Sequence, residues 1–311
     1  MSELFEKYQI PLGDWIQALL DVLVHDWRAA FQAIRVPIGT LLDSIASLLN
    51  ATPPEVFLIA LFLICWQIST IRLAVFSVVA MAFLGFIGVW SESMTTIALV
   101  LTSVIICVVI GIPLGILAAR NNSFEAVLRP FLDVMQTLPG FVYMVPVVML
   151  VGIGNVPGVL VTIVFALPPV IRLTNLGLRE VPGELIEAAR AFGSSESRML
   201  LTIQLPLAGP TIMAGVNQTL MMTLSMVVYA SMIAVEGLGQ VVLRGIGRLD
   251  MGLAAVGGIG IVILAVILDR VTQAMAVRRE GRITRRGPIG LIRALVDKSR
   301  ATPGQVAQRI G

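Results

Sequence analysis

The stretch MLLTIQLPLAGPTIMAGVNQTLMMTLSMVVYASMIAV, residues 199–235, contains no Asp, Glu, Lys or Arg in 37 residues. A second stretch, residues 251–268, is free of these charged residues over 18 positions. About 20 consecutive apolar residues are enough to cross a lipid bilayer as a helix. The two stretches therefore predict membrane-spanning helices, and the rest of the chain can be interpreted outward from them.

The composition of the whole chain agrees with a membrane protein. Of the 311 residues, 57% are apolar before the 28 glycines are counted, and only 13% are charged. A soluble domain has about 25% charged residues, because a fold of this length needs a large polar surface. The composition thus excludes soluble enzymes and nucleic-acid-binding proteins, and it predicts an all-α polytopic membrane protein.

The apolar runs predict about seven membrane-spanning helices. The first two are separated only by a short polar segment, but one helix over residues 56–90 is too long for a single crossing, so two short spans are predicted. The predicted spans are residues 56–70, 73–90, 95–118, 135–152, 156–172, 210–234 and 251–269. Residues 119–134, 173–209 and 235–250 are expected to be loops between spans.

The segment before the first span, residues 1–55, has a helical pattern of its own. Its apolar residues over 14–31 are spaced as on one face of a helix, which Pro37 is predicted to end. Residues 38–49 are then predicted to form a second short helix. Two arrangements are open: amphipathic helices lying on the membrane surface, or a soluble cap packed on the bundle.

Charge is distributed unevenly along the chain. Residues 1–55 have three basic and seven acidic side chains, residues 56–275 have ten of each, and residues 276–311 have nine basic and two acidic. Arg and Lys next to a span hold that segment on the cytoplasmic side. We therefore expect a cytoplasmic C-terminal tail and, with seven spans, a periplasmic N-terminus. Five tail arginines are also expected to contact anionic lipid: Arg278, Arg279, Arg282, Arg285 and Arg286.

The longest predicted cytoplasmic connection, residues 173–209, contains VPGELIEAARAFGSSESRMLLTIQLP at 181–206. Pro182 favours the first turn of a helix, and Gly193 interrupts that helix. Pro206 is expected to end a second helix before the chain enters the membrane again. The pattern predicts a two-helix elbow at the membrane surface.

The side chains of this elbow, residues 182–205, suit contact with another protein. Glu184 and Glu187 lie near the positive end of the first helix dipole. Ala188 and Ala189 leave a low surface that a partner can approach closely. The elbow is therefore predicted to insert into a groove on a partner protein.

Glu187-Ala188-Ala189, three residues, Gly193, nine residues and Ile203-x-Leu205-Pro206 resemble the cytoplasmic signature of ATP-binding-cassette (ABC) importer permeases. Other stretches narrow the resemblance to the permease subunits of glycine-betaine and proline-betaine importers, whose relatives import choline or similar trimethylated amines. These stretches are Pro113-Leu-Gly115, Gln136-Thr-Leu-Pro139, Gly152-Ile-Gly154-Asn155-Val-Pro157-Gly158, Met213-Ala-Gly215-Val-Asn217-Gln218 and Gly245-Ile-Gly247-Arg248-Leu-Asp250-Met-Gly252.

The resemblance implies a type I ABC-importer permease bundle in the bacterial inner membrane. It implies a homodimer that forms the pathway, two ATPase subunits that use ATP and Mg²⁺, and a periplasmic binding protein that delivers glycine betaine, proline betaine, choline or trimethylamine N-oxide. The ATPase is expected to contact the elbow and the signature residues that follow. They are Glu184, Glu187, Ala188, Ala189, Gly193, Ile203, Leu205 and Pro206.

The residues themselves also call for a separate ATPase. The chain has two lysines, Lys7 and Lys298, and neither lies in a GxxxxGK[ST] phosphate loop. The single His25 and the isolated Cys65 and Cys107 make no catalytic pair and no metal-ligand set. We therefore expect a non-catalytic subunit that itself binds no cofactor, metal or nucleic acid.

The sixth predicted span has a polar stripe, because Gln218, Met222, Ser225, Tyr229 and Met232 share one helical face. Such a face avoids lipid, so it either lines the translocation pathway or packs against another helix. Tyrosine faces can also hold a trimethylammonium cation. The candidate pathway residues are Tyr143, Asn217, Gln218, Ser225 and Tyr229.

Two alternative functions were compared with this one. A permease of an ABC importer for another small polar solute has the same architecture. A secondary transporter normally needs an ionisable residue inside the membrane. The sixth and seventh predicted spans have none in their interiors, and Arg72 and Arg172 fall at span ends, which argues against the secondary transporter.

Overall fold

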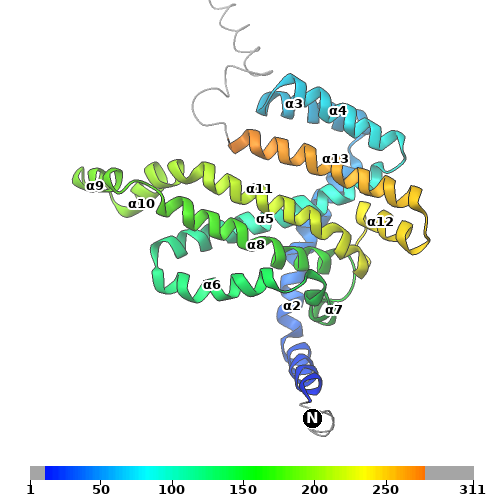
Figure 1. The fold of residues 1–311 in the computed structure, drawn as a ribbon, viewed down its shortest axis with the longest axis horizontal. Coiled ribbons are helices and arrows are strands. Elements are labelled where there is room, and N and C mark those ends of the chain that lie inside the picture. The colour runs from blue at the N-terminus through cyan, green and yellow to red at the C-terminus, as the bar shows by residue number, and fades with distance from the viewer. Residues whose placement is uncertain (1–10, 277–311) are drawn as a thin grey trace, which may run out of the picture.

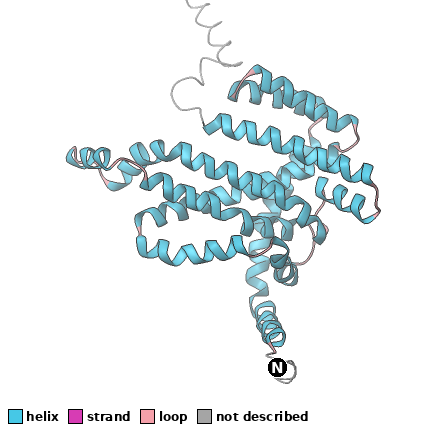
Figure 2. Cartoon of the chain, in the orientation of Figure 1, coloured by secondary structure: helices cyan, strands magenta, loops and turns pink. Residues whose placement is uncertain are grey.

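The computed structural model describes residues 11–276, and this part of the chain folds as helices without a strand (Figure 2). The all-α prediction is confirmed. In chain order the helices are α2 (Leu12–Ala51), α3 (Pro54–Ile68), α4 (Ile71–Phe86), α5 (Trp90–Arg120), α6 (Asn122–Thr137), η1 (Gly140–Tyr143), α7 (Met144–Val151), α8 (Asn155–Arg179), α9 (Gly183–Ala191), α10 (Glu196–Met199), η2 (Leu200–Gln204), α11 (Leu205–Ala230), η3 (Ser231–Ile233), α12 (Leu238–Gly247) and α13 (Met251–Ala276). The basic tail and its five arginines lie outside the described residues.

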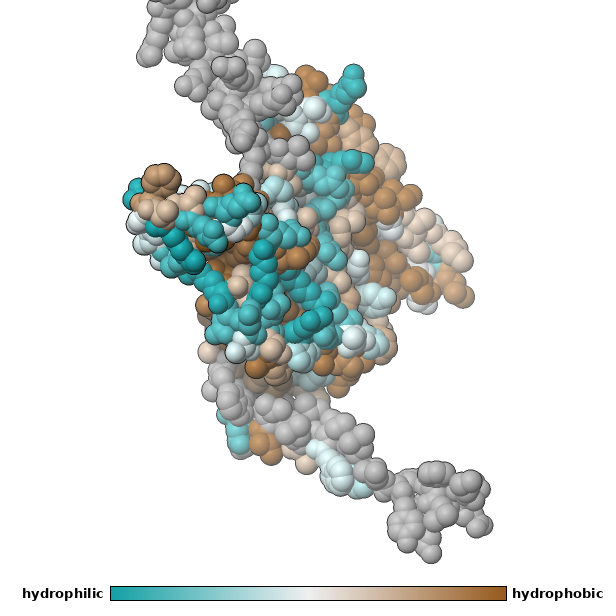
Figure 3. All heavy atoms as spheres, turned by 60° about the vertical axis from the view of Figure 1, so that its left-hand side comes forward, coloured by the Kyte–Doolittle hydropathy of each residue, from teal (hydrophilic) through white to brown (hydrophobic). Residues whose placement is uncertain are grey.

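The long helices lie side by side, with α8 between α6 and α11 and with α13 beyond α11 (Figure 1). The pair α3 and α4 lies along α13 at one edge, while α9 and α10 project from one end of the bundle. Hydrophilic residues gather at the end that comes forward in Figure 3, and the flanks are largely hydrophobic. The bundle thus has the apolar belt and polar end of a membrane protein.

Four helical segments of the described chain are long and apolar enough to cross a membrane, and two strongly bent pairs raise this number to six. The four are Trp90–Arg120, Asn155–Arg179, Glu196–Ile233 and Met251–Ala276. α3 belongs to one bent pair, and α4 is an apolar helix of only 16 residues. The break at Ser69 and Thr70 confirms that residues 56–90 form two helices.

The predicted boundary between a loop at 119–134 and a span at 135–152 is wrong. α6 occupies 122–137, and the chain turns by 104° before it continues as η1 and α7. Pro139 explains the position of the turn, because proline disfavours the helical conformation of the residue before it and Leu138 is extended. The charged residues that suggested a loop lie on a helix.

The N-terminal prediction also needs a correction, since Pro37 lies inside α2 and does not end it. Proline removes one backbone hydrogen bond of a helix. Ile38 and Leu42, which follow it directly, are buried in the core with residues of α5 and α8. The Arg35 side chain also donates to the Val151 carbonyl oxygen at 3.3 Å. This packing lets the helix continue through the proline.

The segment predicted as a loop at 235–250 contains helix α12. The chain before α12 is fixed by two side chains from other helices. Asn155 Oδ1 accepts from the Glu236 amide at 2.9 Å, and Thr96 Oγ1 accepts from the Leu238 amide at 2.9 Å. These bonds join the starts of α5 and α8 to the chain that enters α12, opposite the elbow.

Glycines let the central helix α8 approach α5 and α11 closely. A Cβ atom on Gly115 of α5 would lie 2.8 Å from the Ile171 carbonyl oxygen of α8. A Cβ on Gly215 of α11 would lie 3.2 Å from the Val170 Cα. Small residues at such crossings allow the backbone contacts that stabilise helix pairs in membranes. α5, α8 and α11 therefore form the tightly packed centre of the bundle.

We predict that Gly115→Ala lowers the melting temperature of the purified protein. The added methyl group forces α5 and α8 apart, at a cost of about 1–3 kcal/mol for an overpacked contact. Gly258→Ala in α13 is the matched control, because nothing lies within 4 Å of its added Cβ. Alanine also favours helix there. Equal melting temperatures for the two variants would contradict the close approach.

Candidate functional site

The first helix of the elbow, α9, has defined ends. Pro182 precedes it, and Glu184 lies in its first turn. The Ser194 amide donates to the Ala189 carbonyl at 3.0 Å, and the Gly193 amide donates to the Arg190 carbonyl at 2.9 Å. These two bonds form a Schellman motif, whose left-handed position is Gly193 with φ +73°. The predicted helix break at Gly193 is confirmed.

Side chains hold the two elbow helices at a fixed angle. The Arg190 Nε donates to Glu196 Oε1 at 3.0 Å, which joins α9 to α10. The Ser195 hydroxyl caps α10 by accepting from the Arg198 amide at 3.4 Å. Arg120, the last residue of α5, donates to the Glu196 carbonyl at 3.2 Å. The elbow is thus a folded unit tied to the end of α5.

The role predicted for Pro206 is wrong, because the second elbow helix does not end there. Residues Glu196–Ile233 form one continuous helical segment, and Pro206 lies in its interior. The turn before the proline, Leu200–Gln204, is a π-helix, and the Leu205 amide donates to the Leu200 carbonyl. A wider turn makes room for a ring that has no N–H and clashes with the preceding α-helical turn. The elbow is therefore continuous with α11.

The exposed side chains of the elbow differ from the prediction in two respects. Glu184, Glu187 and Ala188 are exposed, and Ile203 and Leu205 are half-buried. Ala189 is only 7% exposed, so its methyl group packs inside the elbow and leaves no surface for a partner. Phe192, which the sequence analysis did not single out, is 91% exposed at the helix break.

A cavity of about 340 Å³ separates α6 from α8 near the elbow end of both helices. Arg172 Nη2 lies 2.6 Å from Asp133 Oδ1, and Arg179 Nη2 lies 2.8 Å from Glu125 Oε2. Because α8 continues to Arg179, Arg172 lies inside the helix and not at its end. The prediction that Arg172 lies at the end of its helix is therefore wrong. The cavity is lined by Ala118, Glu125, Leu128, Arg129, Leu132, Asp133, Ile171, Arg172, Asn175, Leu176 and Arg179.

The polar stripe of α11 lies open within this chain. Gln218, Ser225 and Tyr229 are exposed, and Tyr229 keeps 49% of its surface accessible. The Ser225 hydroxyl bonds only its own helix, donating to the Met221 carbonyl at 3.0 Å. Met222 is half-buried beside the Gln136 amide of α6. Within residues 11–276, the three exposed residues make no side-chain bond to another helix.

Two predicted pathway residues lie away from this stripe. Asn217 Nδ2 donates to Asp269 Oδ1 at 2.9 Å, and Thr272 donates to Asn217 Oδ1, so this amide connects α11 to α13. The Tyr143 hydroxyl donates to the Met135 carbonyl at 2.6 Å and closes the bend after α6. Asp269, placed at a span end by sequence, lies seven residues before the end of α13. Asn217 and Tyr143 thus hold helices together.

Comparison with known proteins places these features in a family. Residues 111–281 match the model of the binding-protein-dependent transport system inner membrane component. The chain belongs to this family. The matched segment includes α6, α8, the elbow, α11 and α13, so every candidate site lies within the family domain. The chain is therefore the permease component of a transport system.

Two curated relatives cover most of the permease. The glycine betaine/proline betaine transport system permease protein ProW of Escherichia coli (strain K12) is 58% identical over 93% of this chain and 82% of its own length. The glycine betaine transport system permease protein OpuAB of Bacillus subtilis (strain 168) is 40% identical over 88% of this chain and 97% of its own length.

A solved structure supports the same fold. In an inward-facing structure of the MetNI methionine ABC transporter, one chain is 26% identical to the permease and matches it with a TM-score of 0.51. The match covers 64% of this chain and 95% of the other. The predicted type I ABC-importer permease bundle is confirmed.

We predict that Gly193→Val opens the end of α9, whereas Gly193→Asn preserves it. The left-handed conformation costs a side-chain-bearing residue roughly 1–2 kcal/mol, less for Asn and more for a β-branched residue. No atom lies within 4 Å of an added Cβ, so the effect is conformational and not steric. Hydrogen exchange at the Gly193 and Ser194 amides should accelerate in the Val variant alone. Equal protection in both variants would contradict this.

Proposed function

We propose that this permease is the transmembrane subunit of an ATP-driven importer of quaternary-ammonium osmolytes, with glycine betaine and proline betaine as its substrates. The observation that carries the proposal is the 58% identity with ProW over 93% of the chain. Choline and trimethylamine N-oxide belong to the same chemical class. Titrating the cognate binding protein with each of the four compounds, followed by uptake in proteoliposomes, tests the substrate. Uptake of none of them would contradict the proposal.

We further propose a division of labour among several subunits. Two copies of the permease form the pathway, two ATPase subunits bind ATP and Mg²⁺, and a periplasmic binding protein delivers substrate. The sequence supports a separate ATPase, because neither lysine of the chain lies in a phosphate loop. The open polar stripe of α11 supports a partner on that face, since exposed polar groups in lipid are costly.

The elbow is the proposed docking site for the ATPase. Phe192 supports this role, because a large apolar side chain held out at a helix end is an anchor that a pocket on a partner can enclose. Glu184, Glu187 and Ala188 of α9 are also exposed. The π turn supports coupling, since it keeps the elbow continuous with α11 and lets a displacement reach the membrane.

The proposed orientation places the elbow in the cytoplasm. Counting α3 and α4 as separate crossings, together with α5, the α6–α7 pair, α8, α11 and α13, gives seven. Seven crossings put residues 1–55 on the periplasmic side and the tail, residues 276–311, inside, with the permease domain, residues 56–275, between them. The +7 net charge of the tail supports this orientation.

The proposed pathway combines the exposed stripe of α11 with the cavity between α6 and α8. The ion pair Arg172–Asp133 supports this assignment, because both residues line the cavity and give it charged groups that water or a polar solute can contact. Gln218, Ser225 and Tyr229 are the pathway residues on α11. Asn217 and Tyr143 take supporting roles, since their hydrogen bonds join elements of one chain.

We predict that Phe192→Ala releases the ATPase from the purified complex. Loss of a central apolar anchor costs about 2 kcal/mol or more of binding free energy. Leu249→Ala is the matched control, because Leu249 is also highly exposed but lies beyond α12, at the end opposite the elbow. The measurement is co-purification of the ATPase with each variant. Retention of the ATPase by Phe192→Ala would exclude Phe192 as the anchor.

A series of single cysteines tests orientation and pathway together. Both native cysteines are buried and are first replaced by alanine. In spheroplasts, an impermeant maleimide should label Ile153→Cys but not Phe192→Cys, with the opposite result in inside-out vesicles.

A small hydrophilic thiol reagent should label Ser225→Cys in the water-lined pathway, but not the exposed Val109→Cys on the outer face of α5. Labelling of Val109→Cys and not Ser225→Cys would reverse the pathway assignment.

A further inference from the structure

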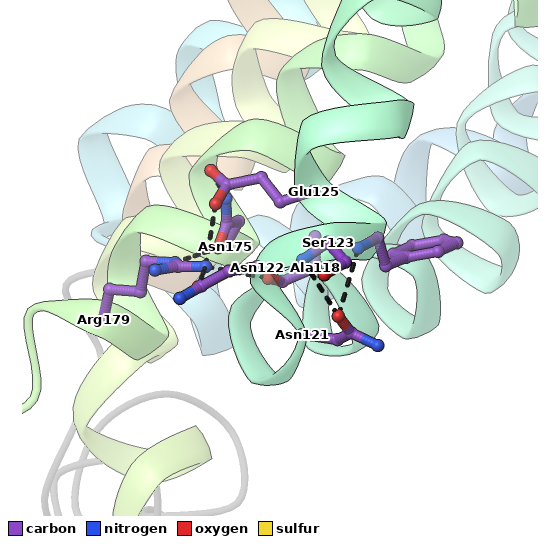
Figure 4. A network of polar contacts seen from close by, with 8 residues as sticks. Ala118, Asn121, Asn122, Ser123, Glu125, Asn175 and Arg179 are labelled. Carbon is purple, nitrogen blue, oxygen red and sulfur yellow. Dashed lines mark hydrogen bonds and ion pairs between the residues drawn. The ribbon is translucent and has the colours of Figure 1, made fainter.

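Arg179, the last residue of α8, binds two other helices through one guanidinium group (Figure 4). Its Nη2 donates to the Ala118 carbonyl at 3.0 Å, to Asn122 Oδ1 at 2.7 Å and to Glu125 Oε2 at 2.8 Å. Its Nε donates to Asn175 Oδ1 at 2.8 Å. Arg179 therefore connects the end of α5, the start of α6 and the end of α8.

The acceptors of Arg179 are the groups that helix ends leave available. The Ala118 carbonyl is one of the last four of α5, which lack partners inside their own helix. Glu125 lies in the first turn of α6, where a carboxylate is favoured by the helix dipole. The two N–H groups of Nη2 are shared among the acceptors on α5 and α6, while the Nε bond to Asn175 fixes the plane of the guanidinium group. A lysine ammonium has a single nitrogen and cannot be fixed in this way.

The elbow begins close to Arg179. Glu180, Val181 and Pro182 are the only residues between it and α9. Val181 is buried and proline has a fixed φ, so this connection is short and stiff. A displacement of α9 is thus carried to the last turn of α8. The Arg120 bond to the Glu196 carbonyl ties the other side of the elbow to the end of α5.

α6 is the helix that such a displacement can move. The cavity of about 340 Å³ separates part of α6 from α8, so polar contacts along its edge help to set the spacing of the two helices. By contrast, α8 packs on α5 and α11 through close glycine contacts. Movement of the elbow therefore reaches α6 most directly through the bonds of Arg179.

We propose that Arg179 is a positioning residue that transmits movement of the ATPase-bound elbow to the start of α6, and so opens and closes the cavity between α6 and α8. This inference rests on the proposed function of the elbow. It assigns Arg179 to energy coupling and not to ATPase docking, because its side chain bonds α5, α6 and its own helix and not the elbow.

The test compares Arg179→Gln with Arg270→Gln in the reconstituted complex of permease, ATPase and binding protein. Both arginines are exposed near the C-terminal end of a long apolar helix, but of the two only Arg179 bonds other helices among the described residues. The readout is the number of ATP molecules hydrolysed per substrate transported. We expect this ratio to rise about fivefold or more in Arg179→Gln, the lower range of typical coupling effects. In Arg270→Gln it should change less than about twofold.

Two further measurements separate coupling from folding. Arg179→Lys keeps the charge but loses the Nε bond to Asn175 that fixes the guanidinium group, so its ratio should rise toward that of Arg179→Gln. Hydrogen exchange of residues 121–137 should change between ATP-free and ATP-trapped wild type, and this change should disappear in Arg179→Gln. Equal ratios in the Arg179 and Arg270 variants, or an unchanged hydrogen-exchange response, would overturn the inference. Loss of the ATPase from Arg179→Gln would also overturn it, while leaving the proposed function intact.

Discussion

The close approach of α8 to α5 and α11 is the contact on which the other features of this permease depend. Within a bilayer the apolar side chains gain little by leaving lipid, so helices associate through packing and polar contacts. Gly115 and Gly215 supply the packing here by removing side chains where backbones meet. The elbow follows directly from this arrangement, because it joins the ends of α8 and α11. The three helices α5, α8 and α11 form a fixed centre, and a cavity lies between α8 and the neighbouring helix α6.

Hydropathy predicted the helical class and the long spans, but it divided the chain wrongly around α6. The charged side chains Glu125, Arg129 and Asp133 made the segment resemble a loop. Two of these residues are neutralised by Arg172 and Arg179, which lie about 40 to 50 residues further along the chain. Hydropathy is averaged over a short window of sequence and does not detect an ion pair with a distant helix. It therefore could not show that residues 119–134 contain a helix.

The elbow was more predictable because its geometry is local. The αL turn at Gly193 follows from glycine itself. Burial is a tertiary property, and the pattern therefore could not tell which of Ala188 and Ala189 faces outward. Phe192 could have been noticed as an aromatic residue next to a predicted helix break. The continuation of the helix through Pro37 and Pro206 could not be predicted, since a proline ends a helix unless packing or a wider turn accommodates it.

The number of residues in the π turn at Leu200–Gln204 sets the direction in which the elbow points from α11. A π turn contains one residue more than an α-helical turn. Deleting a single residue from it restores ordinary helical phase and rotates everything before it by roughly 100° relative to α11. Phe192 then points to a different side of the molecule while every side chain facing the pathway stays in place. A change in the length of that turn would therefore displace the docking surface without altering the pathway.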